Sequence, residues 1–240
     1  CAMGLATPLS ILVGTGRGAE LGLLFRRGDA LQRLSEVKTL AFDKTGTLTL
    51  GHPELTDLIP VAGITAEDAL ATAAAPGARS EHPLGRAIVA AAEARGLPLP
   101  RARKVEALPG RGLSAEVDGK TVLLGNARAM TEAGVDIGPL AAQALALAGE
   151  GKTSIYLARD SAAIALLAVA DPIKEHAAEA VSALQAAGIE VALVTGDAKP
   201  TAEAVARRLG ITRVEAEVLP EGKVAAVNAL GGKGAVAFVG

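Results

Sequence analysis

Residues 38–49, with the sequence KTLAFDKTGTLT, join a short apolar run to a turn rich in lysine, threonine and glycine. The apolar residues predict a buried strand that ends at Asp43. Ligands bind at this end of the strands in α/β sheets, and the backbone N–H groups of the following turn suit a phosphate. Asp43 is therefore either a carboxylate that caps the turn or a nucleophile that accepts a phosphoryl group.

The chain from Asp171 onward alternates between helical and strand-like segments, which predicts a parallel sheet with helices on its faces. The strand at 38–42 joins that sheet if residues 52–168 form an inserted domain. Helices from Thr65 and Pro83, a hairpin at 104–124, two shorter helices and two apolar strands predict an α+β insertion. The segments expected in the later sheet are helices 174–188, 198–209 and 220–230 and strands 190–195, 213–218 and 235–240.

Composition excludes several classes of function. The 240 residues carry a formal net charge of −2, so the basic surface that nucleic-acid binding needs is absent. Aromatic residues make up 2% of the chain, which argues against base-stacking platforms. A single cysteine excludes an internal disulfide and fits a reducing compartment.

The first 14 residues, CAMGLATPLSILVG, are apolar and uncharged. They are too few to span a membrane, because a transmembrane helix needs about 20 residues. Two interpretations stay open. The segment is either a buried helix or strand, or it is the last part of a membrane helix followed by arginines on the cytoplasmic side.

The string DKTGT at 43–47 resembles the phosphorylation sequence of the P-type ATPases, a family within the haloacid dehalogenase superfamily. Its chance occurrence in a chain of this length is on the order of one in ten thousand, which favours the nucleophile interpretation of Asp43. A TGD string before a helix, a lysine after a proline at the head of a later helix, and the DPIK string at 171–174 occur in the family's order. Each alone has an ordinary explanation as a helix cap or a solvated side chain. The resemblance implies catalytic roles for Asp43, Lys44, Thr45, Thr195, Gly196, Asp197 and Lys223.

The inserted segment contains SEHPLGRAI at 80–88, which matches the nucleotide-binding sequence of the heavy-metal-transporting (P1B) branch. A G-x-G string and the dipeptide Gly-Asn follow at positions that support this match. One departure is Gly77, which stands where the family has a glutamate that contacts adenine. The resemblance implies that ATP is bound by Glu81, His82, Gly110, Gly112, Gly125 and Asn126.

The opening CAMGLATP resembles the sequence around the membrane metal site of the copper-transporting members. The resemblance implies that Cys1 is a thiolate ligand of the transported ion, and thiolates suit Cu(I). A single cysteine with nothing before it is otherwise uninformative. Members of the branch that transport zinc-group metals have a different sequence after this cysteine, so copper is favoured as the transported ion.

The resemblance implies a haloacid dehalogenase-like parallel-sheet phosphorylation domain with an inserted nucleotide-binding domain. The implied function is ATP-driven export of a heavy metal through the cell membrane, with this portion facing the cytoplasm. The implied partners are ATP, the transported metal, the rest of the transporter's membrane domain and a copper chaperone. The expected boundaries are 1–34 for the end of a membrane helix and a stalk, 35–51 and 169–240 for phosphorylation, and 52–168 for nucleotide binding.

The resemblance further implies that Mg²⁺ is held by Asp43 and by the backbone carbonyl of Thr45. Superfamily phosphatases have a second aspartate at position 45 as a general acid and base, and threonine cannot do that work. Three alternatives remain: a phosphatase with a cap domain, a non-catalytic nucleotide-binding module, and a pump for zinc-group or other cations. The family's GDGxND run, which supplies a magnesium carboxylate, would begin at Gly240. We therefore expect the isolated chain to bind nucleotide and to phosphorylate poorly.

Overall fold

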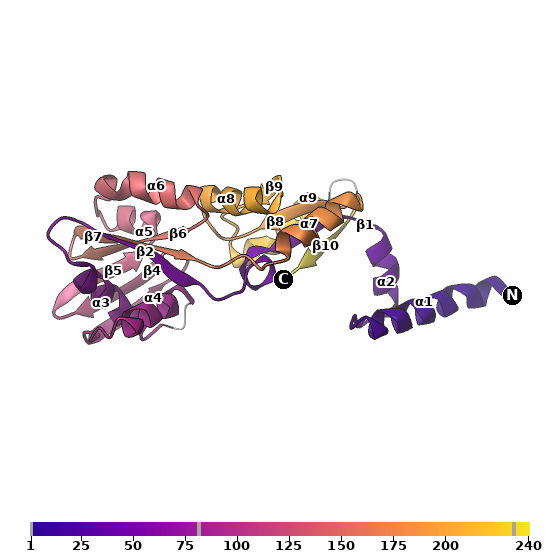
Figure 1. The fold of residues 1–240 in the computed structure, drawn as a ribbon, viewed down its shortest axis with the longest axis horizontal. Coiled ribbons are helices and arrows are strands. Elements are labelled where there is room, and N and C mark those ends of the chain that lie inside the picture. The colour runs from indigo at the N-terminus through magenta and orange to yellow at the C-terminus, as the bar shows by residue number, and fades with distance from the viewer. Residues whose placement is uncertain (1, 81–82, 232–233) are drawn as a thin grey trace.

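The computed structural model describes residues 2–80, 83–231 and 234–240, and it contains two β-sheets that follow one another along the long axis of the molecule (Figure 1). The four-stranded sheet has the order β10-β1-β8-β9, and the six-stranded sheet has the order β2-β7-β6-β5-β4-β3. The chain begins the first sheet with β1, builds the second sheet, and then returns to complete the first. The predicted fold class, an α/β parallel-sheet unit with an inserted α+β unit, is therefore confirmed.

All pairings in the four-stranded sheet are parallel. β1 (Val37–Asp43) lies between β8 (Glu190–Val194) and β10 (Ala235–Val239), and β9 (Arg213–Glu215) pairs with β8. The register places Asp43 beside Val194, so β1 and β8 end at the same edge of the sheet.

Helices cover both faces of this sheet. α7 (Ala177–Ala186) and α8 (Lys199–Leu209) pack on one face, and α9 (Lys223–Leu230) packs on the other. Burial on both faces accounts for the uninterrupted apolar sequence at 191–194, which shows no alternation of polar and apolar residues.

The predicted strand at 213–218 is too long, because β9 ends at Glu215. Glu217 adopts a φ of +59°, which extended strands do not allow. Its N–H donates to the carbonyl of Asp197, and the N–H of Val218 donates to the carbonyl of Thr195. Residues 216–218 therefore leave the sheet to bind the turn that follows β8.

The six-stranded sheet is antiparallel and carries a pair of helices on each face. α3 (Ala66–Gly77) and α4 (Pro83–Ala94) share a core with one face, and α5 (Ala127–Glu132) and α6 (Ala141–Gly149) share a second core with the other. The strands are β2 (Glu54–Pro60), β3 (Ala102–Leu108), β4 (Gly112–Val117), β5 (Lys120–Gly125), β6 (Thr153–Arg159) and β7 (Ala162–Ala170).

The N-terminal segment forms α1 (Ala2–Glu20) and α2 (Gly28–Ser35), which extend away from the two sheets (Figure 1). Leu9, Leu12 and Val13 of α1 are each at least 60% exposed, so this part of the helix is not buried against the rest of the described chain. Among the residues that the structure describes, no helix has the length and apolar character needed to cross a membrane.

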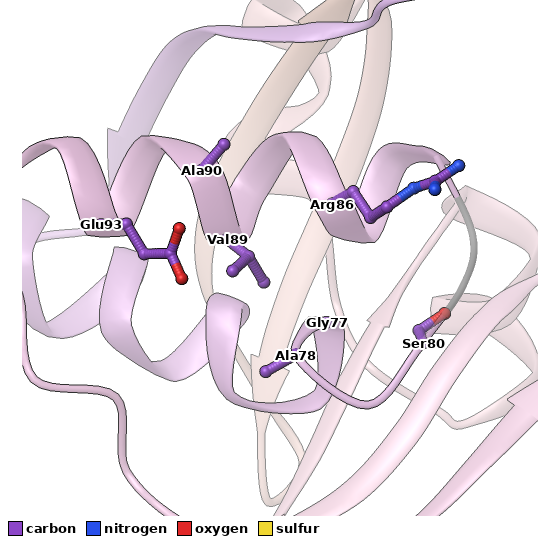
Figure 2. Close-up of a pocket in the computed structure, with 7 residues that line it drawn as sticks. All are labelled: Gly77, Ala78, Ser80, Arg86, Val89, Ala90 and Glu93. Carbon is purple, nitrogen blue, oxygen red and sulfur yellow. The ribbon is translucent and has the colours of Figure 1, made fainter.

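α3 and α4 touch through two glycines. A Cβ atom added at Gly77 would lie 2.9 Å from the carbonyl oxygen of Gly85 and 3.2 Å from a methyl carbon of Val89. Figure 2 shows Val89 and Glu93 of α4 beside the end of α3, where they line a pocket of about 560 Å³. The glutamate that the resemblance leads us to expect at position 77 would have to push the two helices apart.

We predict that Gly77→Ala lowers the free energy of unfolding by about 1–2 kcal/mol, because the new methyl group overpacks the contact between α3 and α4. Urea denaturation measures this change. Gly149→Ala is the matched control, since Gly149 is also the last residue of a helix and a Cβ there meets nothing within 4 Å. Equal effects of the two substitutions would contradict the packing argument.

Candidate functional site

Asp43 lies at the C-terminal end of the central strand β1 and begins the turn at 44–48. Gly46 makes this turn possible, because its φ of +77° lies in the left-handed region that glycine adopts at little cost. The N–H of Gly46 donates to the Thr49 hydroxyl at 3.2 Å. The strand and its turn therefore present the Asp43 carboxylate at the sheet edge, 22% exposed.

Two lysines and two aspartates meet at this edge. Lys223, at the start of α9, donates from Nζ to Oδ2 of Asp43 at 2.6 Å. Lys44 turns the other way and forms an ion pair with Asp197, and its side chain is only 9% exposed. Among the described residues, the buried Oδ2 of Asp197 has no partner except this ammonium group. The two ammonium groups and the two carboxylates have no net charge together, so a phosphoryl group that entered the site would make it negative.

The turn after β8 contains Thr195, Gly196 and Asp197. Thr195 is 3% exposed, and its hydroxyl accepts a hydrogen bond from the Asp197 N–H at 3.2 Å. Its backbone N–H donates to the carbonyl of Glu215 at 2.9 Å. Neighbouring backbone thus fixes this turn beside Asp43, and all seven residues predicted as catalytic lie at this sheet edge or on the elements that end there.

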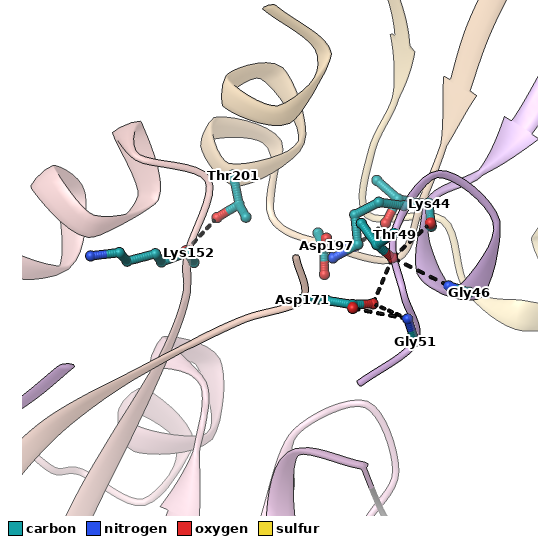
Figure 3. A network of polar contacts seen from close by, with 9 residues as sticks. Lys44, Gly46, Thr49, Gly51, Lys152, Asp171, Asp197 and Thr201 are labelled. Atoms are coloured by element: carbon teal, nitrogen blue, oxygen red, sulfur yellow. Dashed lines mark hydrogen bonds and ion pairs between the residues drawn. The ribbon is translucent and has the colours of Figure 1, made fainter. Parts of the chain in front are cut away.

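The segment that returns from the six-stranded sheet supports the Asp43 turn, a role that sequence analysis missed. Asp171 accepts hydrogen bonds from the hydroxyl of Thr49 at 2.6 Å and from the N–H of Gly51 at 2.9 Å (Figure 3). It also accepts a hydrogen bond from the N–H of His52 at 3.1 Å. Lys174 donates from Nζ to the carbonyl of Gly46 at 3.0 Å. The only sequence signal for this network was the DPIK string, whose contacts a linear sequence does not reveal.

A second contact joins the two units through α6 and α8. The Thr201 hydroxyl donates to the carbonyl of Lys152 at 3.1 Å (Figure 3). The Lys152 ammonium group forms ion pairs with Asp57 and Glu150. Burial raises the pKa of Asp57, but hydrogen bonds from Lys152 and Thr56 outweigh it and hold that pKa below its usual value. Because α8 begins two residues after Asp197, this contact connects the insertion to the Asp43 site.

The residues expected to bind nucleotide form a separate group on the six-stranded sheet. Gly112 and Gly125 face each other across β4 and β5, and Asn126 donates from Nδ2 to the carbonyl of Gly110 at 2.9 Å. The other predicted residues of the two binding sites, Glu81, His82 and Cys1, lie outside the described residues.

The Asp43 site offers hard oxygen ligands that fit Mg²⁺. The Oδ1 atom of Asp43 has no hydrogen-bond partner in the described part of the chain, and the carboxylate is partly exposed. Mg²⁺ is usually bound by one or two carboxylates together with substrate phosphates and water. Within residues 2–80, 83–231 and 234–240, no three His, Cys, Asp or Glu side chains gather in a group that could hold a metal ion alone.

The comparison with protein families matches residues 37–240 to the haloacid dehalogenase-like hydrolases. Relatives include copper-transporting ATPase 1 of Rhizobium meliloti, which is 51% identical over 100% of this chain and 29% of its own length. The copper-exporting P-type ATPase of Legionella pneumophila is 48% identical over 98% of this chain and 32% of its own length. The chain thus spans about a third or less of these relatives.

Solved structures with the same fold include a zinc-transporting PIB-type ATPase in its E2.Pi state. It is 36% identical, with a TM-score of 0.70 over 100% of this chain and 39% of that chain. The catalytic domain of a CPx-ATPase, 22% identical, aligns with a TM-score of 0.69 over 94% of this chain and 79% of its own. The second likeness shows the fold alone.

We predict that Lys44→Met lowers the free energy of unfolding by about 3 kcal/mol, because it leaves the Asp197 carboxylate buried without its counter-charge. Urea denaturation measures the loss, and the double variant Lys44→Met/Asp197→Asn should recover much of it. Lys199→Met is the control: the Lys199–Glu203 pair is exposed, and its loss should cost less than about 0.5 kcal/mol. A double variant no more stable than Lys44→Met would contradict this explanation.

Proposed function

The chain belongs to the haloacid dehalogenase-like hydrolase family, and we propose that it forms the ATP-binding and phosphorylation portion of a P-type ATPase that exports Cu(I). The observation that carries this proposal is the Asp43 carboxylate at the sheet edge with the Lys223 ammonium 2.6 Å away. Copper transport is supported by relatives of 45–51% identity that are named for copper.

In the proposed organisation, residues 35–51 and 169–240 form the phosphorylation domain, residues 52–168 form the nucleotide-binding domain, and residues 1–34 lead to the membrane. The portion would face the cytoplasm and work with the membrane domain of the pump, the metal that Cys1 would help to bind, and a copper chaperone. The separate sheets support this division, since each has its own core.

The proposed reaction transfers the γ-phosphoryl group of ATP to Asp43. A carboxylate oxygen of Asp43 attacks phosphorus in line, the bond from phosphorus to the β–γ bridging oxygen breaks, and ADP leaves with that electron pair. Lys223 stays beside the carboxylate and neutralises charge on the phosphoryl oxygens. The Thr195 hydroxyl, which accepts from the Asp197 N–H, would donate its own hydrogen to the same group.

Asp43 and the carbonyl of Thr45 would hold Mg²⁺, which when bound neutralises phosphate charge. Thr45 also decides the fate of the aspartyl phosphate, since it cannot act as the general base for hydrolysis. A long-lived intermediate suits a pump, whose domains must move before dephosphorylation.

A second cargo, Zn(II), has an observation in its favour. The structure aligned over 100% of this chain with a TM-score of 0.70 is titled a zinc-transporting ATPase. Its 36% identity is lower than the 51% of a relative named for copper. Copper therefore remains the proposed cargo, and zinc is the alternative that the experiment distinguishes.

The test measures phosphoenzyme in membranes that contain a full-length pump carrying this chain, with γ-labelled ATP, acid quench, and Cu(I) or Zn(II) in turn. We expect label with Cu(I) that hydroxylamine removes and that Asp43→Asn abolishes. Asp118→Asn is the control, because Asp118 lies in an exposed hairpin turn away from the site and should retain the label.

The other outcomes of this test identify the alternatives. Label with Zn(II) alone would keep the mechanism and replace the cargo. Absence of label with every ion would leave a nucleotide-binding module, and steady phosphate release from small phosphoesters would indicate a phosphatase.

We predict that Lys223→Met lowers the initial rate of phosphoenzyme formation by about 100-fold, because the charge that meets the transferred group is lost. The rate is measured by rapid quench at saturating ATP. Lys223→Arg should retain more activity than Lys223→Met, since it keeps the positive charge. A Lys223→Met rate within a few fold of the unmodified protein would argue against this role.

A further inference from the structure

The junction between β5 and α5 holds the loop at 110–112 through the side chain of Asn126. Its Nδ2 donates to the carbonyl of Gly110 at 2.9 Å, and its Oδ1 accepts from the N–H of Ala129 at 3.0 Å. Its backbone N–H donates to the carbonyl of Arg111 at 2.9 Å. The side-chain amide therefore links two segments: its nitrogen is hydrogen-bonded to the loop and its oxygen to the first turn of α5.

The same junction meets the loop in direct backbone contact. A Cβ atom added at Gly112 would lie 2.1 Å from the carbonyl oxygen of Leu124, and one added at Gly125 would lie 2.5 Å from the carbonyl oxygen of Arg111. No side chain fits at either position without a shift of the backbone. The loop and the end of β5 are thus packed as one unit.

Ion pairs at Glu132 also attach the loop to α5. Arg111 donates from Nη1 to Oε2 of Glu132 at 2.6 Å, and Arg128 donates from Nε to Oε1 of the same carboxylate at 2.9 Å. The hydrogen bonds from Arg111 and Arg128 lower the pKa of Glu132, so its carboxylate is charged at neutral pH. α5 therefore holds the loop at Arg111 as well as at Gly110.

We propose that Asn126 and Glu132 are positioning residues: they hold the loop at 110–112 in one conformation before an adenine nucleotide binds. Asn126 then acts through this loop, and not as the direct nucleotide ligand that the resemblance implies. That the ligand is a nucleotide rests on the proposed function, whereas the hydrogen bonds that hold the loop are present in the structure without a ligand. A loop ordered in advance spares the nucleotide the entropy cost of ordering it. One lost hydrogen bond of this kind weakens binding about 2- to 10-fold.

The variant that separates the two roles of Asn126 is Asn126→Ser. Serine can still cap α5, but its hydroxyl is too short to reach the Gly110 carbonyl. In the nucleotide-free chain, hydrogen exchange by NMR should accelerate about 10-fold at the amides of Arg111 and Gly112 and stay unchanged at Ala129. Calorimetry should show the Kd for ATP rising about 5-fold.

Glu132→Gln tests the ion pair independently, and Glu116→Gln is its matched control. Glu116 pairs with Lys104 at 2.9 Å in the same hairpin, and within the described part of the chain its side chain forms no hydrogen bond or ion pair with the loop. Glu132→Gln should accelerate exchange at Arg111 and raise the Kd about 2-fold, whereas Glu116→Gln should change neither.

Two results would overturn the proposal. A higher Kd in Asn126→Ser with unchanged loop exchange would mean that Asn126 contacts the nucleotide directly. Faster exchange with an unchanged Kd would mean that the order of the loop does not matter for binding. If the unmodified chain binds no ATP, the proposed function fails and the role in affinity fails with it, while the exchange data still decide whether Asn126 holds the loop.

Discussion

The hydrogen bond between Lys223 and Asp43 depends on a sheet whose central strand is the first in the sequence. β1 can end beside β8 and below the start of α9 only if later segments of the chain return to both of its sides. Parallel pairing brings the ends of these strands to one edge, so a carboxylate and an ammonium group 180 positions apart in sequence meet at 2.6 Å. The α/β architecture thereby assembles a charged site from residues that local structure alone would keep apart.

Two segments connect the units, because the second unit is inserted between β1 and β8, and these two segments bind each other. The chain leaves the first unit just after the Asp43 turn and returns at Asp171, and the Asp171 carboxylate binds the departing segment at Thr49 and Gly51. The same returning segment supports Gly46 through Lys174. The connection that joins the two units therefore also supports the turn that follows Asp43.

The Asp43, Thr195 and Lys223 set could be predicted because the DKTGT and TGD strings and a lysine after a proline resemble sequences of the P-type ATPases. Periodicity located only the strands and helices on which these residues lie. The sequence did not reveal the roles of Asp171 and Lys174, since these depend on hydrogen bonds between segments more than 100 positions apart. The early end of β9 was missed for a similar reason: Glu217 adopts its positive φ in order to bind the Asp197 carbonyl. From the sequence, Gly77 was only the position where a glutamate that contacts adenine is missing. In the structure it packs against Gly85, a contact that a single sequence does not show.

The two groups of candidate residues are built differently, and the difference follows from their chemistry. The Asp43 site combines four charges and buries Lys44 and one carboxylate oxygen of Asp197, and its fixed ammonium groups would meet the negative charge of the proposed phosphoryl group. The loop at 110–112 uses backbone groups and glycines, which allow close approach without adding charge. A nucleotide that bridged them would need the units in one defined orientation, and the Thr201–Lys152 contact joins them at the helix that begins after Asp197. A change in that orientation would therefore break or shift this contact, which lies on the helix that begins two residues after Asp197.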